Sequence, residues 1–319
     1  MESINKITEH YKIRYNQPDD ELHFYNAGEE DMWNRGNGQS FTVNYSVPTL
    51  VEGAFTKYKK EDVVYDLVDR VYRCRPFEDY KTVDLLVLGC SHTFGVGLPQ
   101  EHVWHHQLAD LMNIKHENIC NLGVPSMGPN FVRNMLLAYM QSDMPRPKHI
   151  AILWPNMYRI EIQVEEYGIT NNLCVFGDFD LTPKVFGYNN TQLKAWKLWE
   201  NENPNLWNAR QNDAFLVGEM VADMMDSKLA QLCWTEELNV KFVFDQNYKH
   251  RARDLMHMDK KQHGEIASMF IDRFGVSGST AVSKTEGGGS IPPTGAKNWH
   301  GKKSRKVWRD MGVSSFVHK

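Results

Sequence analysis

Apolar residues along the chain fall into short continuous runs and into longer segments with helical spacing. Continuous apolar runs are typical of strands in a parallel sheet, because helices cover both faces of such strands. The runs predict strands at 84–89, 117–123, 149–154 and 239–245. Segments in which apolar residues recur every three or four positions predict helices at 101–113, 128–142, 210–237 and 260–274. This alternation predicts an α/β core domain over 81–275, with a parallel sheet between two helical layers.

Three segments depart from the alternation. Residues 1–80 are polar and aromatic, with a strand expected at 40–51 and a helix at 60–73, and we expect them to form an N-terminal extension packed on the core. Residues 159–208 show turns and little periodicity, which predicts a long insertion. Residues 276–319 begin with a Gly-, Ser-, Thr- and Pro-rich stretch, which predicts a flexible linker followed by a basic tail.

Composition and charge narrow the function classes. The 319 residues are 41% hydrophobic and carry a formal net charge of −4, so we do not expect a general attraction to nucleic acid. The five cysteines are scattered and form no Cys-x-x-Cys pair, so the sequence predicts neither a zinc site nor a disulfide framework. No metal or organic cofactor is expected.

The sequence predicts neither a signal peptide nor a membrane span. The N-terminus has no apolar signal core, and no run of about 18 apolar residues predicts a membrane span. The sequence therefore predicts a protein of the cytoplasm or of a larger assembly, such as a viral one.

The first candidate for chemistry follows the first predicted strand. The apolar run ends at Gly89 and continues into Cys90, Ser91 and His92. Ligands of open α/β sheets bind at the carboxyl ends of strands. Ser91 is therefore either a helix cap, a position that serine favours, or a nucleophile whose own N–H faces a developing oxyanion.

A serine nucleophile needs a base, and a second segment supplies a candidate. Asp254 and His257 are three residues apart, after the last predicted strand. In that arrangement a carboxylate orients an imidazole, which then takes the serine proton. The alternative is that the pair only caps a helix. We expect the pair to converge with Ser91 at the carboxyl edge of the sheet.

Together these stretches resemble the SGNH hydrolases, also called the GDSL esterase/lipase family. "GCSHTFGVGL" resembles the first block of the family, with Cys90 in place of its Asp, and "NLGVPSMGPN" resembles the second. "AILWPNMYR" falls at the third block, where Trp154 and Met157 replace a glycine and an acid, and Asp254 with His257 matches the last block. The resemblance covers residues 84–156 and 239–274.

The resemblance implies a fold and a set of roles. The fold would be a flavodoxin-like three-layer sandwich of SGNH type. Ser91 would be the nucleophile, His257 the base and Asp254 the residue that orients it. The N–H groups of Ser91 and Gly123 and the side-chain amide of Asn156 would form the oxyanion hole.

Other polar residues near these blocks receive simpler interpretations. We expect Cys90 to be a small buried residue, and His92, His105 and His106 to lie on the surface or in the groove. We expect His263 on the surface of its helix.

The implied activity is hydrolysis of a carboxylic ester, with an acyl group on a carbohydrate as one substrate class. Two alternatives remain open: a degenerate hydrolase scaffold that acts as a structural or docking protein, and transfer of an acyl group to a sugar. We expect the insertion to shape the pocket, with Trp196, Trp199 and Trp207 either stacked on sugar rings or part of the core.

The tail is either a solvated segment or a docking segment for a partner protein or for nucleic acid. Six of its residues are basic and crowd together, and Trp299 and Trp308 lie among them. Aromatic residues often anchor interfaces, which favours docking. The basic residues are Lys297, Lys302, Lys303, Arg305, Lys306 and Arg309.

Overall fold

The centre of the fold is a parallel sheet of four strands. The computed structural model describes residues 57–58, 62–63, 65, 67–68, 72–125, 127–157, 159–166, 169–175, 205–234, 250, 252 and 257–275. The strands of this sheet are β1 (Leu85–Gly89), β2 (Ile119–Asn121), β3 (His149–Trp154) and β6 (Lys228–Cys233). Their order across the sheet is β2-β1-β3-β6, and each neighbouring pair is parallel.

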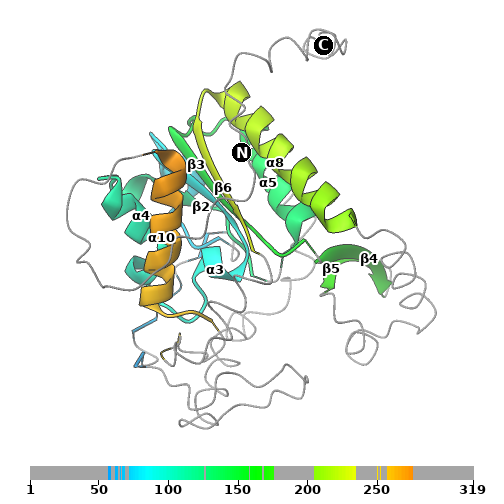
Figure 1. Ribbon diagram of the computed structural model, residues 1–319, viewed down its shortest axis with the longest axis horizontal. Coiled ribbons are helices and arrows are strands. Elements are labelled where there is room, and N and C mark those ends of the chain that lie inside the picture. Colours follow the sequence, from blue (N-terminus) through cyan, green and yellow to red (C-terminus); the bar gives the residue numbers. More distant parts are fainter. Residues whose placement is uncertain are drawn as a thin grey trace. The chain divides into compact units, whose positions relative to one another are not determined.

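Helices cover both faces of this sheet (Figure 1). Helices α4 (Trp104–Leu111) and α10 (Lys260–Phe274) lie together on one face, and α5 (Pro129–Gln141) and α8 (Leu206–Met225) lie together on the other. The short helix α3 (Ser91–Phe94) lies at the end of β1. The described residues also include the single-turn 3₁₀ helices η3 (Phe77–Asp79), η4 (Gln100–His102) and η5 (His116–Asn118). The α/β class expected from the sequence is confirmed.

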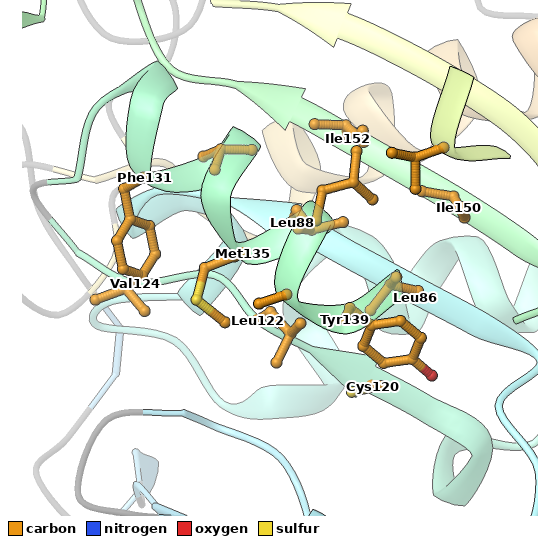
Figure 2. Packing of buried hydrophobic residues seen from close by; sticks show 14 of the residues in the cluster. Leu86, Leu88, Cys120, Leu122, Val124, Phe131, Met135, Tyr139, Ile150 and Ile152 are labelled. Carbon is orange, nitrogen blue, oxygen red and sulfur yellow. The ribbon is translucent and has the colours of Figure 1, made fainter. Parts of the chain in front are cut away.

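Two hydrophobic clusters fill the space between the sheet and its helices. On the α5 side, Leu86 and Leu88 of β1 and Ile150 and Ile152 of β3 pack with residues of α5, as Figure 2 shows. Val87 of β1 belongs to the second cluster, with residues of α4 and α10. Because successive residues of one strand enter opposite clusters, both faces of the strand are buried, and the sequence shows a continuous apolar run.

One predicted helix is wrong in its second half. The helix expected at 210–237 ends at Met225, and residues 228–233 form strand β6. Asp226 ends the helix in the left-handed conformation, with φ 56°. The apolar residues of β6 continue the helical spacing of α8, so periodicity alone does not show the boundary. The strand expected at 239–245 lies outside the described residues.

The segment expected to be an irregular insertion contains a hairpin. Strands β4 (Ile160–Glu166) and β5 (Ile169–Val175) pair antiparallel, from Ile160 with Val175 to Glu166 with Ile169. Apolar and polar residues alternate through β4, which is the sequence signal of a strand. Residues 176–204, with Trp196 and Trp199, lie outside the described residues, and the side chain of Trp207 is also outside them.

The helix expected at 60–73 is not α-helical at its described positions, where Val68 forms an isolated bridge with Tyr72. Tyr72 belongs to the cluster on the α5 side, and Val63 to the other. The buried Arg73 donates to the carbonyl oxygens of Gly95 and Leu98, at 2.8 and 2.9 Å. The strand expected at 40–51 and the tail 276–319 lie outside the described residues.

Candidate active site

The candidate site lies where the chain connections diverge at the carboxyl edge of the sheet. From β1 the chain continues to β2 on one side, and from β2 it continues to β3 on the other side of β1. Such a switch point is the usual ligand site of an open α/β sheet. Ser91 follows β1 there, and Asn156 follows β3.

Ser91 is the first residue of α3 and is 8% exposed. The carbonyl oxygen of Cys90 accepts the N–H groups of Thr93 and Phe94, both at 2.9 Å, so the helix begins immediately after the strand. The amides of Ser91 and His92 precede these first hydrogen bonds of the turn. Cys90 is buried, as the sequence analysis expects.

Two glycines allow α3 to lie close to the strands. A Cβ atom on Gly89 would come within 2.1 Å of Thr93 Oγ1. A Cβ atom on Gly123, two residues after β2, would come within 2.8 Å of the Phe94 nitrogen. Glycine is therefore required at both positions by close packing, and this packing holds Ser91 at the strand ends.

The backbone N–H of Gly123 already has an acceptor. It donates to Oδ1 of the buried Asn121 at 2.9 Å, and Asn121 Nδ2 donates to the carbonyl oxygen of Thr93 at 3.1 Å. The Nε2 atom of His105 lies 3.1 Å from the same Thr93 oxygen. The Asn121 side chain thus joins the end of β2 to α3, and it accepts the Gly123 N–H that the family resemblance implies for the oxyanion hole.

His257 lies beside the residue that follows Ser91. Its ring is edge-on to the ring of His92, with the centroids 5.1 Å apart. The other neighbour of His92 is Trp234, stacked at 4.3 Å. Trp234 directly follows β6, and its N–H donates to the Trp154 carbonyl oxygen at 2.8 Å. The half-buried His257 is thus brought to the α3 end of the sheet, whereas Asp254 lies outside the described residues.

His92 is buried, so it does not lie on the surface, which is one of the two positions expected from the sequence. Burial, with the nearby His257, holds the pKa of His92 well below its usual value, so its imidazole is neutral at pH 7. Its Nδ1 atom has no hydrogen-bond partner among the described residues. Nothing in the sequence indicates this stack, because Trp234 is distant from His92 along the chain.

Asn156 and a buried arginine form the β3 side of the site. The half-buried Asn156 accepts the Arg159 N–H at its carbonyl oxygen, at 3.0 Å. Arg159 Nη1 donates to the Met127 carbonyl oxygen at 3.0 Å, and the charge of Arg159 contributes to the lowered pKa of His92. Arg210 of α8 donates to the Met157 carbonyl oxygen at 2.7 Å. Two arginines thus fix the turn after β3, and sequence reasoning missed both.

Three further histidines are buried and not on the surface, the position expected for His263 and one of the two positions expected for His105 and His106. His263 is 1% exposed, and its Nδ1 accepts the N–H of Trp104 at 3.0 Å, at the start of α4. Burial lowers the pKa of His263 and of His106 to about 3. His105 is fully buried, and its pKa is also well below the usual value. None of the three is a surface group.

The described residues lack two other features. No group of three or more His, Cys, Asp or Glu side chains in this part of the chain could hold a metal ion. No described helix has the length and apolar character needed to cross a membrane.

The fold and the site define an α/β protein with a serine, an asparagine and a histidine near one edge of a parallel sheet. No protein-family model matches the chain, and no curated protein matches its sequence.

Proposed function

We propose that the protein is a serine esterase of SGNH type that hydrolyses a carboxylic ester, with acyl groups on small alcohols or carbohydrates as substrates. The proposal includes the finer fold: a flavodoxin-like three-layer sandwich. The strand order β2-β1-β3-β6 supports it, because it corresponds to the first four strands of the flavodoxin-like order.

A single observation carries the proposal. Segments that are distant in sequence bring Ser91, Asn156 and His257 toward the same switch point, and the contact of His257 with His92 puts the imidazole next to the residue after Ser91. Acyl transfer through a serine requires a nucleophile with a general base beside it.

The proposed reaction has two steps. His257 takes the proton of Ser91 as Oγ attacks the acyl carbon, and it returns that proton to the leaving alcohol. Water, activated by the same imidazole, then releases the acid from the acyl-enzyme. Asp254 orients His257 in this scheme.

The oxyanion hole is proposed to differ from the one the family resemblance implies. The N–H of Ser91 and the side-chain amide of Asn156 remain the donors. Because the Gly123 N–H donates to Asn121, its contribution would require that hydrogen bond to open. The positive charge of Arg159 near the site favours the developing negative charge.

The same hydrogen bond favours a second candidate, a degenerate scaffold with a structural or docking role. An oxyanion donor that is already satisfied, beside a serine that is 8% exposed, fits a site without turnover. Acyl transfer to a sugar would use the same residues as hydrolysis, with a sugar hydroxyl in place of water.

Labelling with a fluorophosphonate probe, followed by peptide mass spectrometry, tests the esterase. The expected result is a bond between Ser91 Oγ and phosphorus, with loss of fluoride. Ser91→Ala and His257→Ala should each abolish it, whereas Ser268→Ala, at an exposed serine of α10, should react like the wild type. A folded wild-type protein that stays unlabelled while a control esterase reacts would favour the scaffold.

A further inference from the structure

Helix α8 has apolar residues on two faces. One face is buried in the cluster on the α5 side and includes Val221, Ala222 and Met225. The opposite face carries Leu216, Met220 and Met224, which are 45%, 37% and 57% exposed. These three residues are spaced by four positions, so they form one stripe along the helix surface. We call this stripe, together with the exposed carboxylates of Asp213, Glu219, Asp223 and Asp226, the α8 face.

The stripe is unusual within the described part of the chain. Four large apolar side chains are exposed there, and Leu111 is the only one that is not on α8. Single exposed apolar residues need no explanation, but a continuous stripe marks an interaction surface. Methionine suits such a surface, because its flexible side chain adapts to a partner.

Acidic residues accompany the stripe. Asp213, Glu219, Asp223 and Asp226 are exposed, and no Lys, Arg or His occurs from Gln211 to Ser227. Partial burial, with the neighbouring charge of Asp223, raises the pKa of Glu219. Such a face attracts a partner that combines positive charge with apolar side chains, and it repels a second α8 face, whose carboxylates would meet its own.

We propose that the α8 face binds the basic segment 297–309 of a second copy of this chain. The segment has the complementary composition: six Lys or Arg residues, with Trp299 and Trp308 among them. The tryptophans would cover the stripe of Leu216, Met220 and Met224, and the basic side chains would pair with the carboxylates. Residues 297–309 lie outside the described residues, and their complementarity to the α8 face is one of composition.

This proposal is independent of the esterase. It uses no residue of the candidate active site, and it applies equally to a catalytic protein and to a scaffold.

Sedimentation velocity of the full chain, from about 1 to about 100 µM, tests the proposal over the range in which a moderate interface dissociates. Wild-type protein should associate with rising concentration, and salt should weaken the association. Leu216→Ser/Met220→Ser/Met224→Ser and, separately, Glu219→Lys/Asp223→Lys should each weaken it about tenfold or more. All five changes are at exposed positions.

A charge exchange makes the test specific. Lys302→Glu/Lys303→Glu should also weaken association. A variant that combines these two substitutions with Glu219→Lys/Asp223→Lys in one chain should associate again like the wild type. Glu78→Lys/Asp272→Lys reverses two exposed carboxylates that are not on α8 and should behave like the wild type. A wild-type protein that stays monomeric, or an association that the exchange does not restore, would overturn the proposal.

Discussion

At the scale of single residues, Asn121 organises the candidate site. Its amide accepts from Gly123 N–H and donates to the Thr93 carbonyl oxygen, so one side chain connects β2 with α3. An aspartate at this position could not do both, because a carboxylate has no donor. Asn121 is thus a positioning residue for Ser91 and makes no contact with a substrate in our scheme.

We expect Asn121→Asp to keep the fold but to disturb α3. The aspartate would still accept from Gly123, while its second oxygen would face the Thr93 carbonyl, at a cost of about 1–3 kcal/mol. Thermal unfolding should show this loss of stability, and fluorophosphonate should label the variant more slowly than the wild type. The control is Asn212→Asp, the same change at an exposed position of α8, which should lower the labelling rate less. Unchanged stability and labelling would show that Asn121 does not position the site.

The sequence could predict part of this site. The position of Ser91 at a strand end follows from the apolar run that precedes it, and the position of Asn156 follows from the next one. The stack of His92 with Trp234 and the role of Arg159 depend on which strands are neighbours, and local spacing contains no such information. The sequence does not predict the burial of His263, because it does not show that the imidazole accepts the backbone N–H of Trp104.

At the scale of elements, the boundary between α8 and β6 shows why some segments could not be predicted. Residues 226–228 separate a helix from a strand, and the apolar pattern continues across them. The usual stop signal is a glycine in the left-handed conformation, but here that conformation is taken by Asp226. The observed bounds of β1, β3 and α10 agree with the predicted ranges to within one residue. Each of these elements ends at a clear signal: Gly89 in β1, Pro155 after β3 and Gly275 after α10.

Asp226→Gly should stabilise the protein by roughly 0.5–1 kcal/mol, because glycine adopts positive φ without the Cβ penalty. Asp213→Gly, in the interior of the same helix, should destabilise it by about 0.3–0.5 kcal/mol, because glycine is a poorer helix former than aspartate. Urea unfolding of both variants tests the opposite signs. If Asp226→Gly were the more destabilising of the two, the cap at this position would depend on the aspartate side chain itself.

At the scale of the whole molecule, buried neutral histidines make stability depend on pH. The pKa values of His106 and His263 are about 3 in the folded protein, and those of His92 and His105 are also well below normal. In the unfolded chain each pKa returns to about 6.5. Below that pH the unfolded state therefore binds more protons than the folded state does, and stability falls.

The contribution of these histidines to the free energy of unfolding should not change with pH above about pH 7. The free energy of unfolding should decrease as the pH falls from about 6.5 toward about 3. Each buried histidine contributes on the order of 1 kcal/mol per pH unit in that window. Urea unfolding at about pH 7.5, 6 and 5 measures the slope. A free energy of unfolding that rises toward pH 5 would contradict the burial of these rings as neutral groups.

The position of β6 has a consequence for synthesis. β3 pairs with β6 from His149 with Lys228 to Trp154 with Cys233, and residues 155–227 lie between the two strands. A chain emerging from the ribosome therefore presents the edge of β3 well before its partner strand exists. Unpaired apolar edges are the usual origin of aggregation. Nascent chains that stop before Lys228 should thus be the ones that depend most on chaperones.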